Sequence, residues 1–183
     1  SLEKSNMMDD RKIKTRHLVE SAYTVLVHFH GLEKSGTLTA PEAQAAATAA
    51  INAMRYEQKE YFWLNDLSTP IPKMIMHPTV PALNGKVLDG ANFNCATTQQ
   101  AGIDGPVVPT DGKKNLFVAF NEVVQKSGHG FVTYNWPKPK LGGGTTEETL
   151  PRGVAESTAL PGAPAPGPPP PAGRQKDAIE EWG

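Results

Sequence analysis

The sequence predicts an α+β domain, in which two helices come first and short strands then alternate with a third helix. Three observations lead to this fold class. Apolar residues recur at helical spacing near the N-terminus, a capping-box sequence opens an alanine-rich stretch, and two later stretches of aromatic and branched residues flank a proline-bearing loop. The 183 residues are enough for one domain with a hydrophobic core.

The first helix is expected over residues 11–32. Its apolar stripe steps by four and three residues, as one face of a helix requires. The stripe consists of Leu18, Ala22, Val25, Phe29 and Leu32. The first turns of this helix are strongly charged, so we expect that end to be solvated or to lead toward a part that is absent here.

The second helix is expected to begin after Thr39 and to run to about Tyr56. Thr39 and Glu42 form a capping box, in which the hydroxyl and the carboxylate each accept a bond from an early backbone N–H. The alanines that follow have two explanations. Either their small side chains let the helix lie close to a neighbour, or they reflect helix propensity alone.

Residues 61–65 and 73–77 are rich in aromatic or branched side chains and predict two antiparallel strands. A long Gly/Asn/Thr-rich stretch, 84–112, reads as a loop. A third helix is expected from about Leu116 until Gly128 stops it, and residues 130–136 alternate like a third strand.

The composition changes beyond Leu141. Eight of the 17 prolines fall between 151 and 171, and branched apolar residues almost vanish there. We therefore divide the chain into a globular domain, 1–141, and a disordered Pro/Gly/Ala-rich tail, 142–183.

The charge and the cysteine content narrow the possible partners. A formal net charge of −1 predicts no general attraction to nucleic acid or anionic lipid, so a small molecule is the expected partner. The single cysteine, Cys95, excludes an intramolecular disulfide and a Cys-based zinc cluster. No window is long and apolar enough to span a membrane, and the abrupt, charged start suggests a domain cut from a longer membrane protein.

The predicted strand pair carries a candidate binding site. Strand alternation places Tyr61, Trp63 and Asn65 on one face, together with Ile75 or His77 of the neighbouring strand, while Phe62 and Leu64 face the helices. Arg55 ends the second helix just before this strand. A guanidinium beside aromatic rings and hydrogen-bond donors suits a small organic anion, because the donors compensate for desolvation of the charge.

Each of these residues also has a purely structural explanation. Arg55 suits a helix C-terminus or an ion pair with Glu57 or Glu60. His77 suits a strand end bonded to backbone, and Tyr61 and Trp63 suit a core. The convergence of these side chains on one strand pair favours the binding site.

Catalysis finds little support in the sequence. His28 and His30 lie two apart on a helix and face different directions, so they form no metal pair. No hydrolase, metalloprotease or nucleotide-binding motif occurs. We expect no enzyme, no metal and no cofactor. The alternatives are an adaptor that acts through the proline-rich tail and, less favoured, a small hydrolase with Asp66 and His77 as acid and base.

The chain resembles the single Cache sensor domain of bacterial methyl-accepting chemotaxis proteins from about Lys12 to Lys140. The resemblance rests on an ordered series of motifs: RY, EYFWLND, MIMHP, LNGK and GFVTYNWPKP. It implies a long N-terminal helix packed on a PAS-like antiparallel sheet. It also implies a periplasmic domain that binds short-chain carboxylates such as acetate, propionate, pyruvate or lactate.

Carried onto this chain, the resemblance implies a pocket formed by seven residues. These are Arg55, Tyr61, Trp63, Asn65, Asp66, His77 and Lys86. It further implies a homodimer formed through the N-terminal helix, with contact to the membrane only through spans of a parent receptor.

The chain departs from the family pattern in two places. Residues 93–115 are longer than the family loop and are interpreted as a surface elaboration. The two closing strands of the family are missing after WPKP, so we expect a sheet that is incomplete at its C-terminal side and exposes an edge beside residues 61–65. The sudden Ala/Pro/Gly bias there suggests a change of reading frame.

Overall fold

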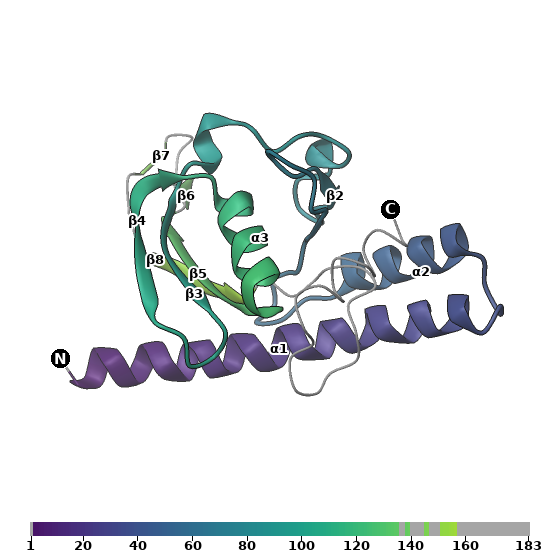
Figure 1. Cartoon of the computed structure of the whole chain (residues 1–183), viewed down its shortest axis with the longest axis horizontal. Helices are drawn as coiled ribbons and strands as arrows, with labels where there is room; N and C mark the ends of the chain where they lie inside the picture. The colour runs from purple at the N-terminus through teal and green to yellow at the C-terminus, as the bar shows by residue number, and fades with distance from the viewer. Residues whose placement is uncertain (1, 136–137, 140–144, 147–150, 157–183) are drawn as a thin grey trace.

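The long helix α1 (Leu2–Lys34) forms the base of the molecule, and a second helix and a sheet pack along it. A computed structural model describes residues 2–135, 138–139, 145–146 and 151–156. The second helix, α2 (Ala40–Ala53), returns beside the C-terminal half of α1, and a sheet lies over the N-terminal half (Figure 1). The α+β class is therefore confirmed, and α1 begins earlier than the sequence predicts.

The two helices pack closely where their side chains are small. The capping box is present, because the Thr39 hydroxyl accepts the Glu42 N–H at 3.3 Å and the Glu42 carboxylate accepts the Thr39 N–H at 3.1 Å. Ala43 and Ala47 are buried against α1, whereas Ala45 and Ala49 are exposed. Both explanations for the alanines therefore apply, each to one face of α2.

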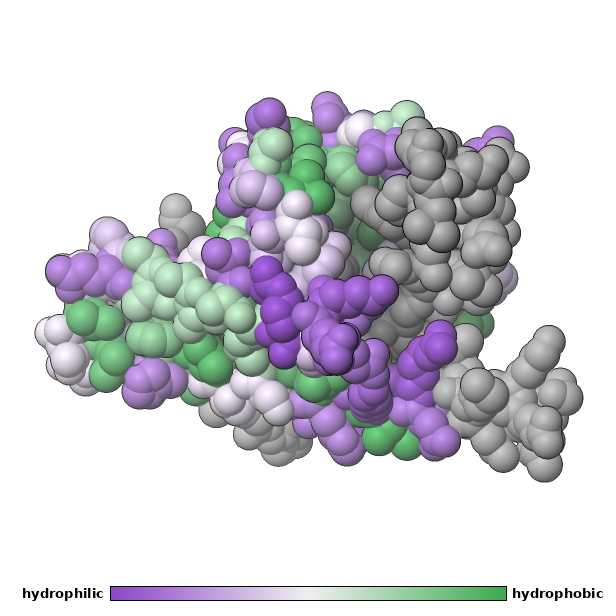
Figure 2. Space-filling view, turned by 180° about the vertical axis from the view of Figure 1, so that it is seen from behind, coloured by the Kyte–Doolittle hydropathy of each residue, from purple (hydrophilic) through white to green (hydrophobic). Residues whose placement is uncertain are grey.

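The view from behind separates two kinds of surface (Figure 2). The end formed by the helical hairpin is mostly pale green, which marks weakly hydrophobic residues, while strongly hydrophilic side chains gather near the middle of the molecule.

Strands β1 (Leu64–Asn65) and β2 (Met74–Met76) pair antiparallel, with Leu64 opposite Met76. Both are shorter than the predicted strands 61–65 and 73–77. The pair ends at Asp66, whose backbone N–H donates to the Lys73 carbonyl at 2.9 Å while its side chain, in place of its carbonyl, accepts the Lys73 N–H at 2.8 Å. Among the described residues β1 pairs with β2 alone, in a sheet separate from the larger one.

The larger sheet is antiparallel, in the order β4-β3-β5-β8. Its strands are β3 (Ala96–Ala101), β4 (Val107–Lys114), β5 (Gly130–Asn135) and β8 (Pro151–Glu156). Two short strands, β6 (Lys138–Pro139) and β7 (Thr145–Thr146), form a third pair, and two 3₁₀ turns, η1 (Pro81–Leu83) and η2 (Ala91–Phe93), precede β3.

The loop expected over residues 84–112 is wrong from Ala96 onward, because two strands of the larger sheet occupy the stretch 93–115, interpreted from the sequence as a surface elaboration. The β3–β4 hairpin fills most of it, and β3 lies inside the sheet because it pairs with β4 on one side and β5 on the other. The polar Thr and Gln residues of β3 do not form a pattern typical of a strand. The strand is stabilised by pairing on both of its edges.

Two described segments of the tail predicted to be disordered, 142–183, form strands, namely β7 and β8. Pro151–Glu156 pairs antiparallel with β5 as β8, which supplies hydrogen-bonding partners for an edge that would otherwise be open. Residues 157–183 lie outside the described part of the chain.

The third helix, α3 (Leu116–Ser127), covers the sheet. The Asn115 side chain accepts the backbone N–H groups of Phe117 and Val118 and so caps the helix start. Gly128 ends the helix with φ 79°, in the left-handed region that glycine enters without strain. The third helix and the third strand confirm the predictions for this part of the chain.

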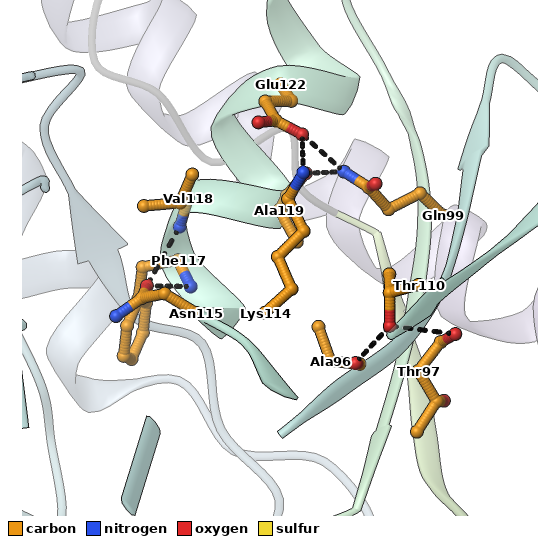
Figure 3. Close-up of polar contacts among 10 residues, drawn as sticks. All are labelled: Ala96, Thr97, Gln99, Thr110, Lys114, Asn115, Phe117, Val118, Ala119 and Glu122. Carbon is orange, nitrogen blue, oxygen red and sulfur yellow. Dashed lines mark hydrogen bonds and ion pairs between the residues drawn. The ribbon is translucent and has the colours of Figure 1, made fainter. Parts of the chain in front are cut away.

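Hydrogen bonds and an ion pair connect α3 to the β3–β4 hairpin (Figure 3). Gln99 on β3 donates to the Ala119 carbonyl at 3.1 Å and to the Glu122 carboxylate at 2.9 Å, and Lys114 at the end of β4 lies 2.5 Å from the same carboxylate. Thr110 on β4 donates across to the carbonyls of Ala96 and Thr97 on β3. The hairpin and α3 are thus joined at several points.

Candidate functional site

Two hydrophobic clusters meet at the β1 segment. Phe62 and Leu64 belong to the cluster between α1 and α2, while Trp63 packs against the cluster beneath α3. The side chains therefore alternate between the two clusters, as the sequence predicts, although only Leu64 and Asn65 form a strand.

Trp63 is fixed by two aromatic rings of α3. Its ring centroid lies 6.0 Å from that of Phe117 and 5.3 Å from that of Phe120, both in edge-to-face geometry. Its indole N–H donates to the Asn65 side-chain oxygen at 3.0 Å. Trp63 is thus half-buried and engaged within the domain.

A network of two side-chain amides continues from Trp63 to α3. Asn65 donates from Nδ2 to the Asp66 carbonyl at 2.9 Å and to the Asn121 side-chain oxygen at 3.1 Å. Asn121 in turn donates from Nδ2 to the same Asp66 carbonyl at 3.0 Å. Asn65 and Asn121 are both buried, and every Asn65 donor and acceptor group has a partner.

Sequence reasoning missed Asn121. A signal was present, because Asn121 follows Phe117 by four residues and precedes Val124 by three, which places it on the apolar face of α3. A polar residue at such a position needs a buried partner.

Tyr61 and His77 form a second group, in which the ring centroids lie 4.9 Å apart in edge-to-face geometry. The His77 Nδ1 accepts the backbone N–H of Val80 at 3.0 Å. Burial lowers the pKa of His77 from its usual 6.5 to about 4, so the ring is neutral at pH 7. With Nδ1 accepting, the ring proton resides on Nε2.

Arg55 lies on the surface just after α2. Its Nη1 donates to the carbonyls of Asn52 and Met54, each at 2.8 Å, so it satisfies the end of the helix. No ion pair joins it to Glu57 or Glu60 within the described ranges, and Glu57 instead pairs with Lys14 of α1. The helix-end role that the sequence left open is therefore present.

The turn after Arg55 brings it back toward Tyr61. Tyr56 and Glu60 exchange two backbone hydrogen bonds, of 3.0 and 2.9 Å, in an antiparallel bridge. In this register the next residues outward are Arg55 and Tyr61, which places their backbones opposite each other.

The two remaining candidates are Asp66 and Lys86. The Asp66 carboxylate accepts bonds from the Ser68 N–H, the Ser68 hydroxyl and the Lys73 N–H, so it shapes the turn between β1 and β2. Lys86 is exposed, and its carbonyl accepts the Met74 N–H at 3.0 Å.

The structure thus brings together Tyr61 with His77, and Trp63 with Asn65, and leaves Arg55 and Lys86 on the surface. Three kinds of donor remain without a hydrogen-bond partner among the described residues. They are the Tyr61 hydroxyl, the Nε2–H of His77 and the Nε/Nη2 edge of Arg55. Each of these donors is of a kind that can bond a carboxylate oxygen.

The rest of the described chain offers no stronger chemistry. Burial raises the pKa of the Cys95 thiol to about 11, which makes it a poor nucleophile at neutral pH. Within the described residues no three His, Cys, Asp or Glu side chains lie close enough to hold a metal ion. The same residues include no helix long and apolar enough to cross a membrane.

One surface groove lies along the exposed side of α1 and measures about 410 Å³. It is lined by Asp10, Ile13, Lys14, His17, Leu18 and Ser21.

A family profile for the Cache domain matches residues 2–149, so the chain belongs to the Cache domain family. The methyl-accepting chemotaxis protein McpP of Pseudomonas putida (strain KT2440) is 40% identical over 129 residues, which are 69% of this chain and 20% of McpP. The chain therefore spans about a fifth of the length of this relative.

Two solved structures are similar in fold. A periplasmic sensor domain of a chemotaxis protein aligns with a TM-score of 0.57 and 33% identity over 82% of each chain. A Cache chemosensory domain studied for carboxylic acid recognition aligns with a TM-score of 0.57 and 31% identity over 76% of this chain and 80% of that one. The resemblance to Cache sensor domains is confirmed. Such domains bind ligands and are not enzymes.

Proposed function

We propose that this domain is the periplasmic ligand-sensing part of a chemotaxis receptor and that it binds a short-chain carboxylate such as acetate, propionate, pyruvate or lactate. The observation that carries the proposal is the set of unused donors around Tyr61. The similarity to a domain that recognises carboxylic acids supports the ligand class.

The Arg55 guanidinium supplies the charge for this ligand. Its bonds to the carbonyls of Asn52 and Met54 use Nη1 alone, and the Nε/Nη2 edge is the one that binds a carboxylate with two parallel bonds. The backbone bridge of Tyr56 with Glu60 brings the Arg55 backbone back toward Tyr61, which supports placing both residues at one site.

Tyr61 and His77 complete the contacts with the anion. His77 is neutral at pH 7 and offers its Nε2–H, while the Tyr61 hydroxyl offers a second uncharged donor. The ring pair excludes water beside the carboxylate, which strengthens the interaction with Arg55.

The other four candidates have supporting roles in this proposal. Trp63 and Asn65 hold the β1 segment against α3, and Asp66 shapes the turn that returns to β2. Lys86 is exposed and adds positive charge nearby.

A signal would pass to α1, because α1 contacts both the turn beside Arg55 and the sheet. Lys14 pairs with Glu57 in that turn, and Lys12 donates to Gln100 of β3 at 2.7 Å while lying 5.4 Å from the Phe131 ring centroid. Binding can shift α1 only as far as the ligand's affinities for the two packings differ.

We also propose that two copies associate through the groove on α1. Ile13 is 49% exposed there, and Asp10 and Lys14 line the same groove with opposite charges, so a second α1 is a complementary partner.

Thermal melting tests the carboxylate site. A ligand at 100 times its Kd adds about 2.7 kcal/mol of stability, a rise of several degrees in Tm. Arg55→Ala is expected to weaken binding about 100-fold through loss of a charge-assisted pair, which leaves about 0.4 kcal/mol at the same ligand concentration. Acetamide and propionamide, which match the size of the acids without the charge, are expected to give no shift.

The matched control is Arg11→Ala, an exposed arginine of α1. It removes the same charge from a different element and is expected to leave the Tm shift intact. A full shift with Arg55→Ala would show that Arg55 is not the anion site, and the absence of any shift across the acids would overturn the proposed ligand class.

A further inference from the structure

We propose that Asn121 on α3 is a positioning residue for the ligand site, which acts by fixing the orientation of the Asn65 side-chain amide. This inference rests on the proposed carboxylate site, because Asn65 belongs to the segment that carries Tyr61. It assigns a role to α3, on which none of the sequence-predicted site residues lies.

The direction of each hydrogen bond fixes the orientation of both side-chain amides. A backbone carbonyl only accepts, so the Asp66 carbonyl requires the NH₂ side of Asn121, which it receives at 3.0 Å. The Asn121 oxygen must then face the other way, where it accepts from Asn65 Nδ2 at 3.1 Å.

The orientation passes from Asn121 to Asn65 and on to Trp63. With both Asn65 Nδ2 protons used by the Asp66 carbonyl and by Asn121, the Asn65 oxygen faces the indole N–H of Trp63 at 3.0 Å. A flipped Asn65 amide would place its oxygen against two acceptors and its NH₂ against an indole donor. The network therefore has one satisfied arrangement.

Burial makes this arrangement costly to break. Asn65 is 6% exposed and Asn121 is 7% exposed, so water does not readily replace a lost partner. Asn121 makes the one side-chain hydrogen bond that links β1 directly to α3 among the described residues.

The β1–β2 pair carries both uncharged donors of the proposed site. Two residues separate Tyr61 from the start of β1, and His77 follows β2 directly. Leu64 pairs with Met76, so an anchor on Asn65 holds both ends of the Tyr61–His77 contact. Asn121 therefore fixes where these donors lie relative to α3.

The first test uses the full chain without ligand. In ¹⁵N–¹H NMR spectra the Trp63 indole resonance, identified with Trp63→Phe, reports on the bond to Asn65. Asn121→Ala is expected to shift this resonance and to speed its hydrogen exchange at least tenfold, and Asn65→Ala is expected to do the same. An unchanged indole resonance in Asn121→Ala, with the fold intact by circular dichroism, overturns the proposal whether or not a ligand is known.

The second test measures Kd for propionate by calorimetry in a double-mutant cycle. Asn121→Ala is expected to raise Kd about tenfold, the effect of one lost buried hydrogen bond. In an Asn65→Ala background the same change is expected to raise Kd less than twofold, because Asn121 acts through Asn65. Equal effects in both backgrounds would contradict the positioning role.

Gln125→Ala serves as the matched control, since Gln125 is exposed one turn further along α3. It is expected to change neither the indole resonance nor Kd. If the parent protein binds no carboxylate at all, the proposed function fails, and the indole resonance alone decides the role of Asn121.

Discussion

At the scale of single residues, the polar residues of the candidate site fall into two groups, which are buried and exposed. Asn65, Asn121 and His77 are all less than a tenth exposed, and each has specific hydrogen-bond partners. Arg55 and Lys86, by contrast, remain on the surface. Burial therefore distinguishes the uncharged candidates, which hold the local structure, from the charged candidates, which lie on the surface.

His77 predicts a pH dependence of stability. Its folded pKa of about 4 lies below the unfolded value of 6.5, so the unfolded chain binds the proton more tightly between these pH values. The stabilisation is complete above pH 6.5 and is lost as the pH falls toward 4, by at most about 3 kcal/mol. Urea unfolding of His77→Asn, whose oxygen replaces Nδ1 as acceptor, is expected to lack this part of the loss.

The control makes the same substitution at an exposed position of α1, His28→Asn, and separates the effect of His77 from a general effect of replacing a histidine. Identical profiles for His77→Asn and the parent would refute the assignment.

At the scale of elements, close backbone approach decides how α3 and the sheet meet. Gly130 opens β5 opposite Ala101 of β3. A Cβ at Gly130 would overlap the Gln100 carbonyl oxygen and a methyl group of Val123. The turn from α3 into β5 thus has no room for a side chain.

Gly130→Ala is therefore expected to destabilise the domain by about 3 kcal/mol, because backbone and a packed core residue must both move. Gly31→Ala is the matched change within α1, where a Cβ meets nothing within 4 Å. It is expected to raise stability by up to about 1 kcal/mol through helix propensity. Chemical denaturation measures both, and a neutral Gly130→Ala would contradict the packing described for β3, β5 and α3.

At the scale of the whole molecule, α1 is the element that contacts both the second helix and the sheet. It packs on α2 near its C-terminal end and meets the sheet near its N-terminal end (Figure 1). If the proposed ligand site moves relative to the sheet, we expect this helix to bend or shift.

Association through α1 gives a prediction at this scale. Ile13→Glu places a charge in the groove and is expected to convert a dimer into a monomer in sedimentation velocity. Ala45→Glu, which adds the same charge on the exposed face of α2, is expected to leave the mass unchanged. A parent protein that is monomeric at every concentration would rule out the proposed dimer.

The local elements of this protein could be predicted from the amino-acid sequence alone. The capping box, the Gly128 stop and the helical stripe are signals confined to one turn or one face, so they predicted α1, α2 and α3. The alternation of Phe62, Trp63 and Leu64 also held, because facing opposite ways is a property of extended backbone. The motif series correctly indicated the Cache family.

The pairing of strands and side chains that lie far apart in the sequence became visible in the tertiary structure. Strand β3 is polar in sequence and exists because β4 and β5 flank it, and β8 exists because β5 has an open edge. Asn121 meets Asn65 across 56 positions of the chain, which no local pattern encodes. Hydrogen bonds between distant segments depend on how the chain folds back, so the sequence predicts the elements while packing selects their partners.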